Sequence, residues 1–236
     1  MLRQRGLGRA LLPKQQTPDH LPAATGHERL DTQLNGGLPR GHISEIAGPE
    51  SSGRTTLIFS LLARATQLGE VAAYIDATNC LDPRSALAAG INLDRLLWVR
   101  CASGERPRYE QVALKQQTGD HAWQAANLVA SAGGFGVIAI DLGGLSLRKQ
   151  REWQSRQWVR LKHAIEHTST ALVLLSERRL AGSIAGVSLE LSRKEVRWEG
   201  ERGASLLLDW LAFQVDVIRA AHGSKRLLEI QATAPF

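Results

Sequence analysis

Short apolar runs alternate with segments of helical periodicity along the middle of the chain. Five runs predict buried strands, at residues 43–47, 71–75, 96–99, 137–140 and 171–175. Segments 57–68, 122–132 and 154–166 carry apolar residues three or four positions apart, which predicts helices. Because the strand runs are apolar instead of alternating, they predict a parallel sheet that helices cover on both faces.

The pattern changes after Gly186 to short segments in which apolar and polar residues alternate. Four of these segments predict antiparallel strands, at residues 188–192, 195–199, 213–220 and 226–231. We therefore expect an α/β fold, a mainly parallel sheet flanked by helices and extended at its C-terminal end by antiparallel strands. The 236 residues suffice for one such domain and would be cramped for two.

Residues 1–27 mix basic side chains with glycine and proline and show little periodicity. We expect a basic N-terminal extension there, a loose tail in preference to a docked helix, followed by one core domain over residues 28–236.

The net charge of +6 favours an anionic partner such as nucleic acid or a nucleotide. Cys80 and Cys101 lack metal-binding spacing, which favours a reducing compartment. No apolar run approaches the ~18 residues of a membrane span, and the N-terminus lacks the apolar stretch of a secretory signal. We therefore expect a cytoplasmic protein with no membrane partner.

A glycine-containing loop joins the first predicted strand to the first predicted helix. Glycines and a helix N-terminus in this order allow backbone N–H groups to surround phosphate oxygens. The consensus G-x-x-x-x-G-K-[ST] is met except at Arg54, where lysine is expected. Arginine binds phosphate as a wide planar fork, so nucleotide binding is favoured over hydrolysis. The candidate nucleotide-binding residues of this loop are Gly48, Pro49, Glu50, Ser51, Ser52, Gly53, Arg54, Thr55 and Thr56.

Asp141 follows the apolar run 137–140 directly, which places a carboxylate at the carboxyl end of a buried strand. Beside a phosphate loop this is the position of a Mg²⁺ ligand, so we predict a metal site formed by Asp141 and Thr55. The alternative is an aspartate that caps a helix or closes a turn.

A basic stretch with two tryptophans, Trp153 and Trp158, lies on the helix predicted near residue 160. It is either a phosphate-backbone or partner-binding stripe, or a solvated helix face whose tryptophans pack inward. Its cationic residues are Arg148, Lys149, Arg151, Arg156, Arg160 and Lys162.

Taken in order, several motifs resemble the RecA recombinase family. They are residues 35–41 (NGGLPRG), Glu45-Ile46, 48–53 (GPESSG), 74–77 (YIDA), 81–83 (LDP) and 137–141 (VIAID). The resemblance spans residues 28–232 and implies the RecA-type P-loop fold, with ATP and Mg²⁺ as candidate cofactors.

The resemblance also implies roles from which this chain partly departs. Thr78 stands where the family has the glutamate that activates water, Ser85 where it has an adenine-stacking tyrosine, and Glu177 where it has a γ-phosphate sensor. Asp82, which contacts the adenine amino group in the family, is kept. Arg219 matches one of two lysines that reach a neighbouring subunit's nucleotide. We expect hydrolysis to be slow or absent.

A short RecA-like core with an altered ATP site resembles the ImuA family. This implies an accessory protein of damage-inducible (SOS) translesion synthesis and mutagenesis, acting beside an ImuB-type Y-family polymerase relative and an error-prone polymerase. The RecA filament and DNA are further candidate partners. Two alternatives stay open, an active RecA/RadA-type DNA-dependent ATPase and a SulA-like cell-division inhibitor. Thr78 weighs against the first alternative, and so do the short intervals 141–176 and 177–189, where the RecA family inserts its DNA-binding loops. The well-preserved phosphate loop weighs against the second.

Overall fold

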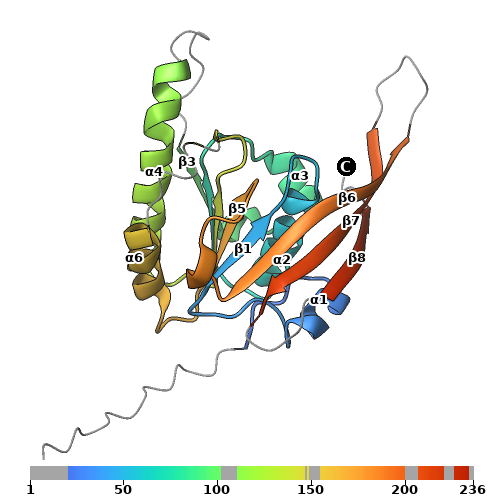
Figure 1. Cartoon of the computed structure of the whole chain (residues 1–236), viewed down its shortest axis with the longest axis horizontal. Helices are drawn as coiled ribbons and strands as arrows, with labels where there is room; N and C mark the ends of the chain where they lie inside the picture. Colours follow the sequence, from blue (N-terminus) through green and yellow to red (C-terminus); the bar gives the residue numbers. More distant parts are fainter. Residues whose placement is uncertain are drawn as a thin grey trace, which may run out of the picture.

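One eight-stranded sheet organises the protein in the computed structural model (Figure 1), which describes residues 21–101, 111–146, 148, 155–199, 207–220 and 226–233. The strand order is β3-β2-β4-β5-β1-β6-β7-β8. The strands are β1 (Ile43–Ala47), β2 (Ala72–Asp76), β3 (Leu96–Arg100), β4 (Val137–Asp141), β5 (Ala171–Ser176), β6 (Val187–Glu199), β7 (Leu207–Arg219) and β8 (Arg226–Thr233).

Strand pairing follows the two patterns seen in the sequence. All pairs from β3 to β6 are parallel, whereas β6–β7 and β7–β8 are antiparallel. The predicted fold class, a mainly parallel sheet with an antiparallel C-terminal extension, is therefore confirmed.

Helices lie on both faces of this sheet. The helices are α1 (Glu28–Gln33), α2 (Arg54–Gln67), α3 (Pro83–Ala88), α4 (Gln111–Ala132) and α6 (Ser155–Ile165), with short 3₁₀ turns η1 (Leu93–Arg95) and η2 (Gly182–Ile184). Alternate residues of a strand point to opposite faces. Tyr74 of β2 accordingly packs in the cluster that contains α2, and its neighbour Ile75 packs in the cluster that contains α4 and α6. In Figure 1, α4 (green) and α6 lie together at one side of the sheet.

Element boundaries differ from the sequence prediction in three main places. Helix α4 begins at Gln111, eleven residues before the predicted start at residue 122. The segments predicted as separate strands at 188–192 and 195–199 form the single strand β6, and this part of the prediction was wrong. Its register with β7 shifts between Arg193 and Glu195, so Lys194 interrupts the alternation of side chains. In addition, β7 begins at Leu207, six residues before the predicted start at residue 213.

Residues 21–27 pack against the core. Ala23 forms a backbone bridge with Leu38, and Thr25 is buried with its hydroxyl bonded to Asp31. The sequence analysis had placed these residues in the N-terminal extension, whose first twenty residues lie outside the described part of the chain.

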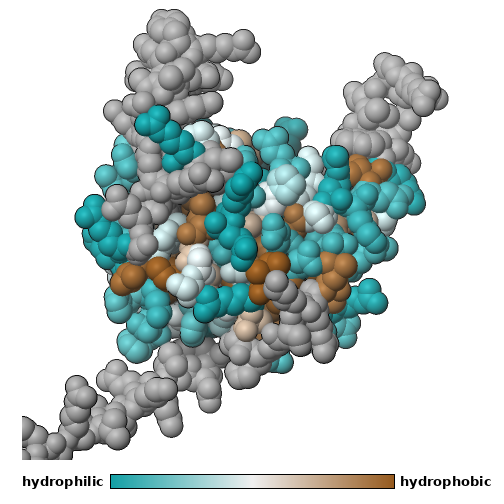
Figure 2. All heavy atoms as spheres, viewed as in Figure 1, coloured by the Kyte–Doolittle hydropathy of each residue, from teal (hydrophilic) through white to brown (hydrophobic). Residues whose placement is uncertain are grey.

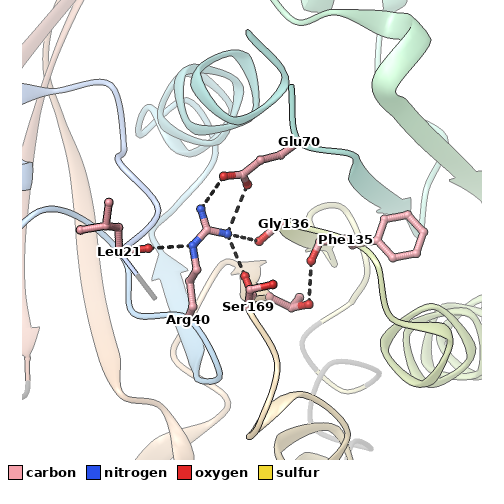
Figure 3. A network of polar contacts seen from close by, with 7 residues as sticks. Leu21, Arg40, Glu70, Phe135, Gly136 and Ser169 are labelled. Atoms are coloured by element: carbon pink, nitrogen blue, oxygen red, sulfur yellow. Dashed lines mark hydrogen bonds and ion pairs between the residues drawn. The ribbon is translucent and has the colours of Figure 1, made fainter. Parts of the chain in front are cut away.

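Arg40 joins the loops at the amino ends of the strands (Figure 3). Its guanidinium pairs with Glu70 at 2.7 Å and donates to the carbonyl oxygens of Leu21, Gly136 and Ser169 at 2.8, 3.0 and 2.8 Å. The candidate site lies at the opposite, carboxyl end of the sheet. Within the described residues, no helix is long and apolar enough to cross a bilayer.

Candidate functional site

The phosphate loop connects the end of β1 to the first turn of α2. Ser51 and Gly53 have positive φ angles of 58° and 96°, and Gly53 caps the helix in the left-handed conformation. A Cβ atom on Gly53 would lie 2.5 Å from the Phe213 ring, and one on Gly48 would lie 2.5 Å from the Leu191 carbonyl oxygen. The loop therefore packs closely on β6 and β7, and larger residues cannot replace these glycines without displacing that contact.

Two polar atoms of the loop region are buried without a hydrogen-bond partner among the described residues. They are Oγ of Ser52, whose side chain is 1% exposed, and Nη1 of Arg54. Buried donors are rarely left unpaired in folded proteins. Both groups can donate to an oxyanion, so this loop is chemically suited to a phosphate group.

Arg54 extends from the start of α2 toward the carboxyl end of β4. A Cβ built on Gly143 would lie 2.9 Å from Oδ1 of Asp141 and 3.7 Å from Nη2 of Arg54, so both groups approach this glycine. Burial raises the pKa of Asp141, against the opposing effects of the hydrogen bonds from Tyr74 and Gly143 and of the Arg54 charge. The structure thus brings together two of the predicted site residues.

Both carboxylate oxygens of Asp141 already accept hydrogen bonds. Oδ2 accepts from the Tyr74 hydroxyl at 2.5 Å, and Oδ1 accepts from the Gly143 N–H at 2.8 Å. Burial and the neighbouring Asp141 charge raise the pKa of Tyr74 well above its usual range, so Tyr74 remains a donor. A Mg²⁺ ion would share this carboxylate with two donors and lie close to the Arg54 cation. The residues present therefore suit phosphate better than metal, and the Thr55–Asp141 metal site stays a prediction.

Thr78, at the position of the family's catalytic glutamate, is held by its own hydrogen bonds. Its hydroxyl donates to the Gly143 carbonyl oxygen at 3.0 Å and lies 3.2 Å from Cys80 Sγ. A threonine hydroxyl does not accept a proton near neutral pH, so this position cannot supply a general base.

Asp76 builds the loop that carries Thr78. Its fully buried carboxylate accepts hydrogen bonds from the N–H groups of Thr78, Cys80 and Leu81 and from Trp98 Nε1. The sequence pattern indicated Asp76 only as part of the motif 74–77. An aspartate directly after a buried strand was the available signal for this role.

Asp82 caps helix α3. Its carboxylate accepts from the N–H groups of Arg84 and Ser85 at 3.3 and 3.0 Å and from the Ser85 hydroxyl at 2.6 Å. The Ser85 hydroxyl and N–H lower the pKa of Asp82. Ser85, at the position of the family's adenine-stacking tyrosine, therefore contacts Asp82, and the adenine contact of Asp82 stays a prediction.

Glu45 is a further structural residue that sequence reasoning missed. It lies in β1 with 0% exposure and accepts from the N–H groups of Leu180 and Ala181 and from the Ser188 hydroxyl, at 3.0, 2.9 and 2.8 Å. These bonds fix the segment after β5 beside the phosphate-loop strand. A glutamate inside a buried run indicates such a role, because an unpaired buried charge is costly.

The basic stretch is only partly described. Arg156 and Arg160 are exposed on α6, Trp158 is buried against the sheet, and Lys162 lies 3.9 Å from Glu166. Arg148 is exposed. Lys149, Arg151 and Trp153 lie outside the described residues. Arg219, at the end of β7, is 3.5 Å from the Gly182 carbonyl oxygen. At least one tryptophan therefore packs inward, and three arginines of the stretch face solvent.

Comparison with known proteins gives the family. The chain is 33% identical to Protein RecA of Methylococcus capsulatus over 171 residues, which is 66% of this chain and 45% of that protein. It is 33% identical to Protein RecA of Laribacter hongkongensis over 181 residues, 70% of this chain and 47% of that protein. With Protein RecA of Thermus thermophilus it shares 39% identity over 131 residues, 55% of this chain and 33% of that protein.

The chain spans about half the length, or less, of the curated relatives that it matches. The sequence profile of the RecA N-terminal domain matches residues 8–187, which is more than half of the chain. The strand order and the position of the phosphate loop agree with this match. The chain belongs to the RecA N-terminal domain family.

Proposed function

We propose that this RecA-family chain is an accessory protein of damage-inducible translesion DNA synthesis that hydrolyses ATP weakly or not at all. The observation that carries the proposal is the state of the site: the Arg54 cation approaches Asp141, and a threonine bonded to Gly143 stands in place of the general base. The phosphate loop has the glycines and the helix N-terminus that bind phosphate, whereas Arg54 and Thr78 replace the lysine and the glutamate expected for ATP hydrolysis.

Two further positions support the loss of turnover. Ser85 is engaged with Asp82, so one face of an adenine site lacks an aromatic partner. Glu177, at the end of β5, puts a carboxylate where a phosphate sensor would need a neutral or positive group. Preorganised charge supplies much of the catalysis in phosphoryl transfer, so these changes act together to slow it.

A protein without turnover would act through its surfaces. Arg156 and Arg160 project from α6 into solvent. On the face shown in Figure 2, hydrophilic side chains predominate and apolar ones form only small groups. Such a surface suits partners held by charge, and we propose an ImuB-type polymerase relative and an error-prone polymerase, with DNA or a RecA filament as further contacts in the cytoplasm.

The test is an ATPase assay on the purified chain with Mg²⁺, with and without single-stranded DNA. We expect hydrolysis at the background rate in both conditions, equal to that of Asp141→Asn. DNA-stimulated turnover that Asp141→Asn abolishes would contradict the proposal.

A second function, that of an active DNA-dependent ATPase, is favoured by one observation. The loop has the glycines and the helix N-terminus that a phosphate-binding loop needs, with Gly53 in the left-handed conformation. In that case Arg54 would replace the lysine in turnover as well as in binding. The same assay decides between the two functions, because only this one gives turnover that depends on Asp141.

A further inference from the structure

The positive charge beside the phosphate loop is part of the chain itself. Arg54 is the first residue of α2, a helix of fourteen residues, and its Nη1 is buried without a described hydrogen-bond partner. Its Nη2 lies close to Gly143, two residues beyond the end of β4. A guanidinium group in this position can donate two hydrogen bonds to one phosphate group.

Ser52 provides an observation that does not depend on the arginine. Its side chain is almost fully buried in the loop, and its Oγ has no described partner. A Cβ on Gly48 would lie 2.6 Å from this oxygen, so the hydroxyl lies inside the loop against its first glycine. An oxyanion in the loop would satisfy the hydroxyl together with Arg54.

The predicted metal ligand Asp141 is poorly placed for a divalent cation. Its two carboxylate oxygens each accept a hydrogen bond, from Tyr74 and Gly143, so a magnesium ion would have to share this carboxylate with two donors or displace them. Such an ion would also have to lie close to the Arg54 guanidinium, which repels it. The cation that this pocket accommodates is the guanidinium already present.

We propose that this loop binds the terminal phosphate of a nucleoside di- or triphosphate directly through Arg54 and without a divalent cation. Arg54 takes the place of both the loop lysine and the metal ion. The inference deepens the proposed function, because it assumes that this RecA-type site has lost its turnover and kept a binding role.

The experiment titrates the full chain with a fluorescent N-methylanthraniloyl ATP, once in EDTA and once in excess MgCl₂. Free ATP carries more negative charge than its magnesium complex. We therefore expect the wild-type Kd in EDTA to be equal to or lower than the Kd in MgCl₂. Competition by unlabelled ADP and by inorganic triphosphate then separates the contribution of the nucleoside from that of the phosphates.

Variants assign the effect to the arginine. In Arg54→Lys the shorter, more compact cation leaves Asp141 accessible, and we expect MgCl₂ to tighten binding by about tenfold or more. The double variant Arg54→Lys/Asp141→Asn should lose that dependence. Arg64→Lys makes the same exchange at the exposed end of α2 and should behave as wild type.

Wild-type binding that tightens tenfold or more in MgCl₂ would overturn the inference, as would undetectable binding in both conditions. Neither result contradicts the accessory role, which requires no nucleotide. Conversely, binding that ignores Mg²⁺ combined with DNA-stimulated turnover would contradict the proposed function and leave this inference standing.

Discussion

Single buried polar residues hold together the segments around the site. Glu45 is the plainest case, because its carboxylate accepts three hydrogen bonds from groups more than 130 positions away in the sequence. Each donor would be left buried and unpaired if the acceptor were lost. The position therefore matters to stability although it lies outside the phosphate loop.

Glu45→Gln should lower the free energy of unfolding by about 1.5 kcal/mol, because a neutral amide forms weaker hydrogen bonds with these donors than the carboxylate does. Urea denaturation at neutral pH measures the change. Glu195→Gln, at an exposed position of β6, is the matched control and should change the free energy by less than about 0.5 kcal/mol. Equal effects of the two substitutions would show that the Glu45 bonds do not stabilise the fold.

His27 makes stability depend on pH. Burial lowers its pKa below the usual value of about 6.5, against the opposing effect of Asp31, and its ring packs edge-on against Phe213. The unfolded chain therefore binds more protons than the native state as the pH falls through about 6.5, and native stability falls with it.

The free-energy advantage of wild type over His27→Gln should therefore be larger at about pH 7.5 than at about pH 5.5. Denaturation of both proteins at the two pH values tests this expectation. The two proteins share every other titrating group, so the change with pH in the difference between their unfolding free energies reports on His27. An advantage that stays constant or grows on acidification would contradict the assignment.

At the scale of elements, continuous patterns were predictable and interrupted ones were not. The parallel strands β1 to β5 match their apolar runs within one or two residues, because burial on both faces leaves a local signal. The strand β6 was divided in the prediction, since the shift near Lys194 resets its alternation. Only pairing with β7, a long-range contact, shows that the strand continues.

In the candidate site, too, the local features were predictable from the sequence and the long-range contacts were not. The phosphate loop is local in sequence and could be recognised from its glycines. The approach of Arg54 to Asp141 could not be recognised from the sequence. Arg54 begins α2, which follows β1, whereas Asp141 ends β4, and β5 lies between β1 and β4 in the sheet. The engagement of Asp141 by Tyr74 likewise depends on the pairing of β2 with β4.

Arg40 is the corresponding junction between elements at the opposite end of the sheet. Its five hydrogen bonds connect residue 21, the end of α2 and the segments that lead into β4 and β5, and its side chain is only 11% exposed. A change here should loosen several elements at once (Figure 3).

Arg40→Gln should lower the free energy of unfolding by about 3 kcal/mol, since it leaves Glu70 and three carbonyl oxygens without their donor. Arg95→Gln is the control, because exposed Arg95 donates one side-chain bond, to Gly69. Its cost should stay below about 1 kcal/mol. Chemical denaturation of both variants compares them directly, and similar costs would refute the assigned role.

At the scale of the whole molecule, the sheet separates the candidate nucleotide site from the candidate partner surface. Helix α2 begins at the phosphate loop and covers one face, while α6 lies with α4 on the other. The net charge of +6 is a property of the complete chain, so attraction to an anionic partner need not involve α6. A test of this surface must therefore distinguish local contacts from total charge.

Reversal of two exposed α6 charges, Arg156→Glu with Arg160→Glu, makes that distinction. We expect binding to single-stranded DNA or to the polymerase-like partner to weaken more than about tenfold, or 1.4 kcal/mol, because the substituted residues would face the anionic partner directly. The control Arg64→Glu with Arg95→Glu changes the net charge by the same amount at exposed positions outside α6. It should weaken binding by less than about threefold, because it reduces only the long-range attraction that salt screens.

DNA titrations at two salt concentrations and a partner pull-down provide the measurements. A steep salt dependence of DNA binding in wild type that becomes shallow only in the α6 variant indicates phosphate contacts at α6. Equal losses in the two variants would mean that total charge drives binding, and unchanged binding in both would leave α6 as a solvated face.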